Sequence, residues 1–281
     1  MRRIALAVVL ALASGCVASR PATERPAAGV DDRTKLADEA LTLDGTKAAT
    51  PRVVKLLQAT LTRSLSSGPD DELRFAPIIA ASLRADSFYT AVVARVANGY
   101  DRERLTRTIS WLRQPLAQKF VQLERDAIDA PPEDVERHAR DSAASADHAE
   151  RVALMARLER AEGMARFQAD VFSALKRGSV KVTNRLVTPE RRITPEEIER
   201  DRRAILATAE ATIPNEMLFT YRRASIAELQ QYVRFEESAE GQWYLDLVRV
   251  AILDAVETGA ERATETLVKA LLQGLPPLER T

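Results

Sequence analysis

Residues 239–273 read AEGQWYLDLVRVAILDAVETGAERATETLVKALLQ, and this stretch decides the fold class of the 281-residue chain. Apolar side chains recur along it every three or four residues, which is the spacing of one helix face. The resulting band is too wide for a helix that only lies on a surface; it contains Trp243, Leu247, Val248, Ala251, Ile252, Ala255 and Val256. Gly274 follows the stretch and favours a helix end. We therefore expect residues 239–273 to form a central helix that other helices surround.

The rest of the chain after residue 31 has the same character. Long stretches rich in Ala, Leu, Glu and Arg favour helix, and no alternation typical of strands appears. Thr194 with Glu197, and Ser225 with Glu228, have the spacing of capping boxes. We expect an all-α multi-helix bundle, with helices over residues 32–44, 51–66, 70–98, 101–113, 115–128, 132–177 with a break near Gly163, 195–222, 225–237 and 239–273. Residues 178–192 are expected to form an exposed loop or hinge.

The chain also contains an internal repeat. Six pairs of residues are each separated by 124 positions: Leu105 and Leu229, Ile109 and Val233, Trp111 and Phe235, Gln118 and Gln242, Phe120 and Tyr244, Leu123 and Leu247. Upstream, the residues from Leu36 to Gly45 are similar to those from Leu154 to Gly163, at a separation of 118. Chance matches in helical sequence would align mainly Leu and Ala. The pattern predicts a bundle built from two related helical halves, residues 32–130 and 131–281.

The repeated residues resemble a family of bacterial exported proteins called domain of unknown function 2059, whose motif joins two helices at a sharp corner. The second half matches it with Glu228, Leu229, Phe235, Ser238, Gly241 and Gln242, and the first half with Pro115, Gln118 and Lys119. The chain departs from the motif in both copies, with Ala239, Trp243, Trp111, Gln114 and Ala117 at the remaining positions. The resemblance implies two degenerate tandem copies in an exported protein.

The motif residues have a physical interpretation. Ser238 can accept a hydrogen bond from the next helix, Pro115 suits a first helical turn, and Gly241 allows another backbone to approach. The aromatic residues are expected to pack in the core. Gln118 and Gln242 can tie the corner's backbone groups together, or they can contact a ligand. The candidate residues for corner or ligand contacts are Trp111, Gln118, Phe235, Gln242 and Trp243.

The N-terminus predicts export. Arg2 and Arg3 precede a short apolar run, and small residues lead to Cys16, the only cysteine. The run is too short to span a membrane, so residues 1–16 are interpreted as a lipoprotein-type signal peptide with acylation of Cys16. Plain secretion after cleavage behind Ala13, or an uncleaved anchor, are the alternatives.

The following residues place the protein in the cell envelope. Residues 17–31 lack periodicity and are expected to be a flexible tether. Val17 follows the cysteine, which favours the outer membrane over inner-membrane retention. We therefore expect an outer-membrane lipoprotein that faces the periplasm and is held through acyl chains on Cys16, or otherwise a protein secreted to the periplasm.

Composition excludes several functions. The 41 basic and 41 acidic residues balance, which argues against a nucleic-acid partner. No phosphate loop, serine elbow, zinc-protease helix or pair of cysteines occurs. His138 and His148 lie ten positions apart, a spacing that does not suit two ligands on one helix, so no metal, cofactor or catalytic residue is expected.

The sequence thus favours a non-enzymatic envelope protein, a helical binding module for another protein or an apolar ligand. The alternative is a structural or assembly factor of the bacterial outer membrane, in which acylation of Cys16 would matter more than any pocket. An enzyme is the third interpretation. The partner, the ligand and the oligomeric state stay open.

Overall fold

The computed structural model describes residues 32–128 and 130–274, and the regular structure in this part of the chain is all helical. The prediction of an all-α multi-helix bundle is therefore confirmed. The predicted signal peptide, the tether and Cys16 lie outside the described residues. The helices are α2 (Asp32–Leu43), α3 (Thr46–Leu65), α4 (Pro69–Ser82), α5 (Ala85–Asn98), α6 (Arg102–Leu112), α7 (Pro115–Ala127), α8 (Pro132–Ser142), α9 (His148–Glu162), α10 (Met164–Thr183), α11 (Pro195–Thr220), α12 (Ile226–Glu236) and α13 (Ala239–Leu272), with a short 3₁₀ turn η1 (Pro189–Arg191).

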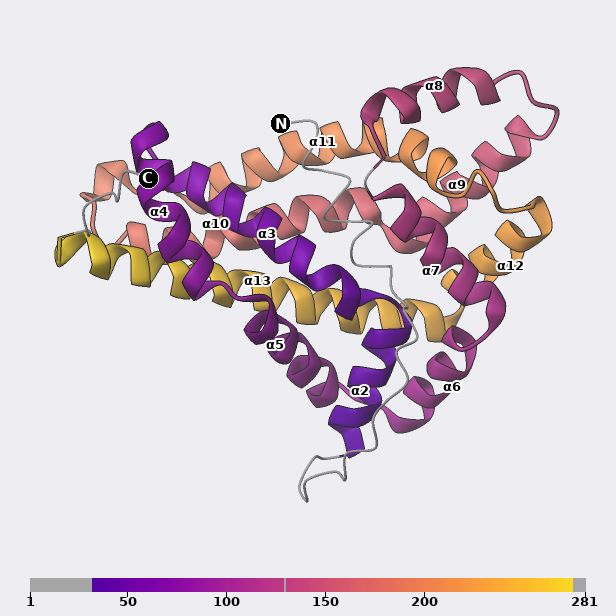
Figure 1. Ribbon diagram of the computed structural model, residues 1–281, viewed down its shortest axis with the longest axis horizontal. Helices are drawn as coiled ribbons and strands as arrows, with labels where there is room; N and C mark the ends of the chain where they lie inside the picture. Colours follow the sequence, from indigo (N-terminus) through magenta and orange to yellow (C-terminus); the bar gives the residue numbers. More distant parts are fainter. Residues whose placement is uncertain (1–31, 129, 275–281) are drawn as a thin grey trace, which may run out of the picture.

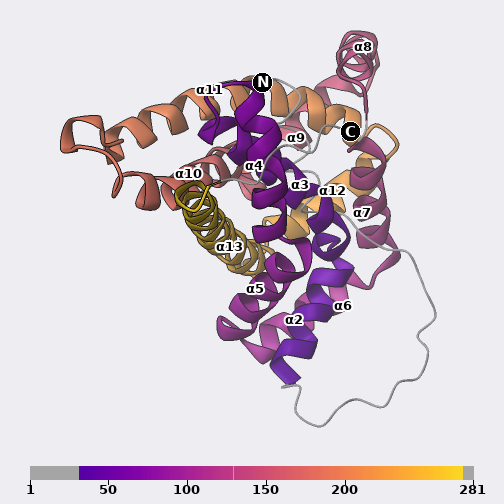
Figure 2. The same ribbon diagram turned by 60° about the vertical axis from the view of Figure 1, so that its left-hand side comes forward.

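Helix α13 is the central helix, as its sequence predicts. It packs against α4, α5, α6, α9, α10 and α12, and Figure 1 shows it running beneath most of the other helices. Its buried band includes Val248, Ala251, Ile252, Ala255 and Val256. Helix α8 stands apart at one end of the bundle (Figure 2), and Val135 is its one buried residue. Helix α13 and the helices packed against it therefore form the centre of the molecule, and α8 lies at its periphery.

The apolar core consists of two clusters that do not follow the predicted boundary at residue 130. The first cluster joins α2 to α6 with α13 and most of the buried face of α10. The second joins α7, α8, α9, α11 and α12 with the start of α10. Helix α7 thus packs with the second half of the sequence, and α13 packs with helices of both halves. Each apolar cluster therefore contains helices from both sides of residue 130.

The helix expected over residues 51–66 begins earlier, at Thr46, and two other predicted helices are divided at positions that were not expected. The helix expected over residues 70–98 is divided at Leu83, whose backbone is non-helical and whose side chain is buried. The side chain of Leu83 faces Gly259 of α13, and its carbonyl accepts a hydrogen bond from Gln58 Nε2 at 2.7 Å. Packing therefore fixes a break that no Gly or Pro signals. The stretch over residues 132–177 is divided at residues 143–147 as well as at Gly163.

The prediction of an exposed loop over residues 178–192 was wrong in its first part. Helix α10 continues to Thr183, and Gly178, Val180 and Val182 are buried. A Cβ atom on Gly178 would lie 2.2 Å from the backbone oxygen of Glu257 in α13. Gly178 is therefore a contact point between two helices and not a helix end. The connection to α11 begins only after this contact.

Across residues 32–128 and 130–274, no helix combines the length and the apolar character needed to cross a lipid bilayer.

The close approach of α10 to α13 at Gly178 predicts that a larger side chain there lowers stability. Gly178→Ala should lower the free energy of unfolding by about 2–3 kcal/mol, because the new methyl group cannot fit without separating α10 from α13. Gly68→Ala is the matched control: its backbone is extended and no atom lies within 4 Å of the added Cβ. Urea denaturation of both variants measures the difference. Equal stability of Gly178→Ala and Gly68→Ala would contradict the tight helix contact.

Candidate functional site

The two predicted corners are formed by α6 with α7 and by α12 with α13. Ser238 Oγ accepts a hydrogen bond from the Gly241 amide at 3.1 Å, and Pro115 is the first residue of α7. A Cβ atom on Gly241 would lie 2.2 Å from the carbonyl oxygen of Phe235, so this position requires glycine. Each corner is thus a short connection between two consecutive helices, over residues 113–114 in the first and 237–238 in the second.

One glutamine secures each corner through two hydrogen bonds to backbone carbonyls. Gln118 Nε2 donates to Leu112 O at 2.7 Å and to Leu43 O at 3.0 Å. Gln242 Nε2 donates to Glu236 O at 2.5 Å and to Ala161 O at 2.9 Å. In both cases the first acceptor is the last residue of the helix before the corner, and the second lies in the last turn of an earlier helix, α2 or α9. The carbonyls at helix ends lack partners within their own helix, so these bonds satisfy groups that would otherwise be buried unpaired.

The two corners contact each other through aromatic rings. Trp111 stacks on Phe235 with ring centroids 4.5 Å apart and planes 16° apart. Two further contacts join the corner segments. The ammonium of Lys119 lies 2.7 Å from Glu228. The guanidinium of Arg104 lies 5.2 Å from the ring centroid of Trp243. The structure therefore brings Trp111 and Phe235 together, while Trp243 lies to the side, half-buried beneath a guanidinium.

A cleft of about 120 Å³ lies between the corners. Its apolar walls are formed mainly by Trp111, Leu112, Ala117, Val121, Met164, Phe167, Tyr232, Phe235, Tyr244, Leu245, Val248 and Ile252. Four ionisable side chains also line it: Asp44, Glu162, Glu236 and Arg249. The lining comes from α6, α7, α10, α12 and α13 and from the ends of α2 and α9, so the cleft exists only because these elements converge.

Two of the cleft's carboxyl groups have no direct partner. Glu162 and Glu236 are only 8% and 7% exposed. Within the described residues, no hydrogen bond or ion pair reaches either carboxyl group. Asp44, in contrast, accepts a hydrogen bond from the Tyr244 hydroxyl at 2.6 Å and another from the Thr46 amide at 2.8 Å. Glu162 and Glu236 therefore give the cleft an acidic lining whose carboxyl groups are not tied to other parts of the protein.

Burial changes the acidity of these groups. Desolvation raises the pKa of Glu236 to about 8, against the lowering influence of Arg249. Desolvation also raises the pKa of Glu162 well above its ordinary range, and neighbouring Glu236 adds to the rise. The pKa of Asp44 is raised to about 6 by desolvation, which its two hydrogen bonds partly offset. The cleft is thus a low-dielectric environment in which a negative charge is costly.

A fourth carboxyl group lies behind the cleft. Glu124 of α7 is buried, and its Oε1 accepts hydrogen bonds from Tyr221 at 2.8 Å and Tyr232 at 3.2 Å. Its other oxygen has no partner. Desolvation raises the pKa of Glu124 well above its ordinary value. Tyr232 therefore connects this deeper group to the wall of the cleft.

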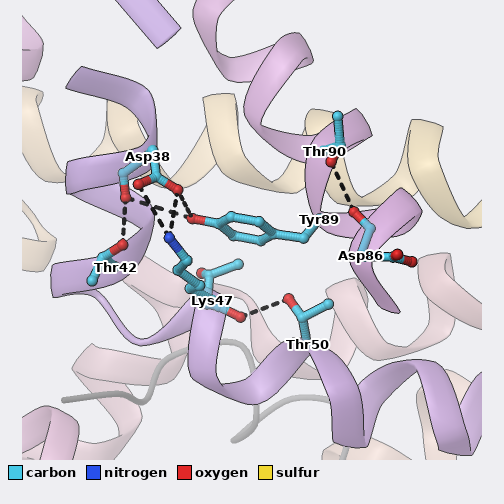
Figure 3. Close-up of polar contacts among 8 residues, drawn as sticks. Asp38, Thr42, Lys47, Thr50, Asp86, Tyr89 and Thr90 are labelled. Atoms are coloured by element: carbon cyan, nitrogen blue, oxygen red, sulfur yellow. Dashed lines mark hydrogen bonds and ion pairs between the residues drawn. The ribbon is translucent and has the colours of Figure 1, made fainter. Parts of the chain in front are cut away.

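A second polar cluster joins α2, α3 and α5 and differs from the cleft (Figure 3). Asp38 accepts hydrogen bonds from Lys47 Nζ at 2.9 Å and from the Tyr89 hydroxyl at 2.8 Å. Lys47 Nζ also lies 5.2 Å from the centroid of the Tyr89 ring. Because the carboxylate of Asp38 is both paired and partly exposed, this cluster needs no further ligand. Its role is to hold the three helices together.

Sequence reasoning did not identify the buried carboxyl groups, although the repeat contains a signal for them. Glu236 stands 124 positions after Leu112, where an apolar side chain is expected, and Asp44 and Glu162 each precede a glycine at the 118-residue separation. The two glycines, Gly45 and Gly163, have positive φ values of 89° and 53°. An acid before a repeated glycine, and an acid at a core position, would have indicated the site.

His138 and His148 are not part of the cleft lining. His138 contacts the edge of the Phe219 ring at 5.9 Å, and Cys16 lies outside the described residues. In the part of the chain that the structure describes, no three His, Cys, Asp or Glu side chains are grouped so that they could hold a metal ion.

No family model matches the chain, and no curated protein or solved structure matches it either. The similarity of the corner motif to an exported bacterial family therefore stays a prediction from the motif residues.

The glutamine bonds predict a loss of stability when one is removed. Gln242→Leu should lower the free energy of unfolding by about 2–3 kcal/mol, because the carbonyls of Ala161 and Glu236 would lose their donor inside the protein. Gln122→Leu on exposed α7 surface is the control, since Gln122 bonds only the nearby Asp126. Thermal denaturation compares the two. Unchanged melting of Gln242→Leu would show that the amide does not hold the corner.

The raised pKa of Glu236 predicts how stability depends on pH. The folded state holds the proton up to about pH 8, whereas the unfolded chain releases it near the ordinary value of 4.5. The folded protein should therefore lose stability as the pH rises from about 4.5 to about 8, by a few kcal/mol, since one pKa unit corresponds to about 1.4 kcal/mol. Glu236→Gln removes this loss, so its advantage in melting temperature over the wild type should grow across that range.

The neighbouring residue provides the control for this experiment. Glu237 is exposed and its hydrogen bond with Arg157 lowers its pKa, so Glu237→Gln should show no growing advantage with pH. If Glu236→Gln and Glu237→Gln have parallel melting profiles from pH 5 to pH 8.5, Glu236 does not titrate as a buried acid.

Proposed function

We propose that the protein is an exported, lipid-anchored and non-enzymatic binding module of the bacterial envelope, and that the cleft between its corners receives an apolar ligand or group. The observation that carries this proposal is the cleft itself, an aromatic and aliphatic cavity at the meeting point of the two corners. Concave apolar sites with a few polar groups are the usual form of small-molecule sites.

The size of the cleft limits the ligand. An engineered cavity of about 150 Å³ holds one benzene molecule, whereas sites for drug-sized ligands measure about 300–1,000 Å³. At about 120 Å³ the cleft suits a single ring, a short aliphatic chain or one side chain of a partner protein. We therefore propose a ligand, or a group on a partner, no larger than one ring.

We further propose that the molecule consists of two related halves, each built around one corner. The two glutamines support this proposal, because their acceptors also follow the repeat. Leu112 and Glu236 are separated by 124 positions, and Leu43 and Ala161 by 118, as the aligned segments require. The stacking of Trp111 on Phe235 is also expected at an axis that relates two equivalent halves, because equivalent residues meet there.

The envelope location rests on the N-terminal sequence. Acylation of Cys16 would hold the protein at the outer membrane, and residues 17–31 would serve as the tether between the acyl chains and the first helix. Such a tether lets the cleft sample the periplasm close to the membrane surface. The alternative is release into the periplasm after signal cleavage, in which case the cleft would act away from the membrane.

Toluene tests whether the cleft receives an apolar ring. In a Trp243→Phe variant, Trp111 is the single tryptophan and lies in the cleft wall, so toluene should change its fluorescence in a saturable manner. The matched Trp111→Phe variant retains only Trp243, which lies outside the cleft lining, and its fluorescence should not respond. A lack of response in both variants, or an equal response in both, would refute binding in the cleft.

A further inference from the structure

The lining of the cleft contains three carboxyl groups and one guanidinium group, that of Arg249. Asp44 is satisfied by Tyr244 and Thr46, but the carboxyl groups of Glu162 and Glu236 are nine-tenths buried and lack a direct partner. Arg249 lines the same cleft and its charge lowers the pKa of both glutamates, but its ion pair is with exposed Asp246 at 3.7 Å. The lining thus has one cationic group for three carboxyl groups, which leaves room for a second positive charge.

A comparison of the two repeated segments explains why Glu162 has no hydrogen-bond donor. Asp44 and Glu162 are equivalent at the 118-residue separation, and each directly precedes a glycine with positive φ. Asp44 is paired with Tyr244, but the residue equivalent to Tyr244 at the 124-residue separation is Phe120, which has no hydroxyl group. Asp44 thus has a hydrogen-bond donor from a distant helix, whereas Glu162 has no donor at the equivalent position.

Glu236 is a carboxyl group at a position where the other copy of the repeat has an apolar residue. It stands at the position equivalent to Leu112, and both residues line the cleft. Gln242 bonds the carbonyl of Glu236 and that of Ala161, the residue before Glu162. The same amide therefore fixes the two backbone segments that carry the unpaired carboxyl groups. The unpaired carboxyl groups of Glu162 and Glu236 differ from the carboxylate of Asp38, which is paired with Lys47 and Tyr89 (Figure 3).

The surroundings favour an organic cation over a metal ion. No three acidic or imidazole side chains within residues 32–128 and 130–274 are grouped closely enough to hold a metal. The walls are instead aromatic, with Trp111, Phe167, Tyr232, Phe235 and Tyr244 around the cleft. Aromatic faces attract ammonium groups, and acid-bearing aromatic clefts are known sites for them.

We propose that the cleft binds a small organic cation, an ammonium group on a single apolar ring or short chain, with Glu162 and Glu236 as its counter-ions. This inference rests on the proposed function, because it names the chemical class of the ligand in the same cleft. The apolar body contacts the aromatic walls, and the ammonium group supplies the donors that the two carboxyl groups lack.

Binding of a cation is coupled to proton release. Burial raises the pKa of both glutamates, to about 8 for Glu236, so at pH 7 Glu236 holds a proton that a bound ammonium group would displace. The other titratable or charged groups facing them are Asp44 between α2 and α3, Glu124 of α7, Glu159 of α9, Tyr221 after α11, Tyr232 of α12, and Tyr244 and Arg249 of α13. Cation binding should therefore strengthen as the pH rises from 6 to 8.

Benzylamine and benzyl alcohol form a matched pair of probes, equal in shape but different in charge. Calorimetric titration of the full chain at pH 8 should show that benzylamine binds about tenfold more tightly than benzyl alcohol, the size expected for one charge-assisted pair. Glu162→Gln and Glu236→Gln should each weaken benzylamine binding about tenfold and leave benzyl alcohol nearly unchanged. Glu237→Gln, an exposed neighbour, should bind both probes as the wild type does.

The outcomes separate the inference from the proposed function. Equal binding of the amine and the alcohol by the wild type would overturn the organic-cation site while the apolar cleft stands. Binding of neither probe would overturn both. If a glutamine variant fails to fold, titration of the wild type in buffers of different ionisation enthalpy decides instead: benzylamine should release protons at pH 7 and benzyl alcohol should not. Absence of proton release would also overturn the inference.

Discussion

The hydrogen bonds of two glutamine amides determine much of the arrangement around the cleft. Each amide joins the end of the helix before a corner to the end of a helix from an earlier segment. The carbonyls concerned are buried helix termini, which have no partner within their own helices. Without these bonds the corner could open, and the backbone that carries Glu162 and Glu236 would no longer be fixed. The position of the unpaired carboxyl groups thus depends on Gln242.

The mixed packing of the two halves of the sequence explains where the cleft lies. Helix α7 packs with α11 and α12, and α13 packs with α4, α5 and α6 as well as with α10, so both corners line the same cleft. Where the corners meet, the rings of Trp111 and Phe235 stack beside this cavity. Three carboxyl groups line that cavity, and burying such groups lowers stability unless they are paired. The unpaired carboxyl groups of Glu162 and Glu236 thus lower the stability of the protein at the cleft for which we propose a ligand.

Much of the fold could be predicted because its determinants are local. The capping boxes at Thr194 and Ser225, the Ser238 cap and Pro115 at the start of α7 each depend on residues within one turn, and the structure contains all four. The break at Leu83 and the helical course of α10 through Gly178 were not predicted. Both depend on α13, which lies far away in the sequence and packs against these positions.

The sequence by itself determined that the chain is helical, where the corners lie and which residues make them, because these properties follow from periodicity and from hydrogen bonds between near neighbours. Only the tertiary structure decided which acids are buried and which have partners. Asp44 and its donor Tyr244 are 200 positions apart, and Glu124 is 97 positions from Tyr221. Burial and pairing of a charge depend on every element that surrounds it, so the chemistry of the cleft arises only when distant helices converge.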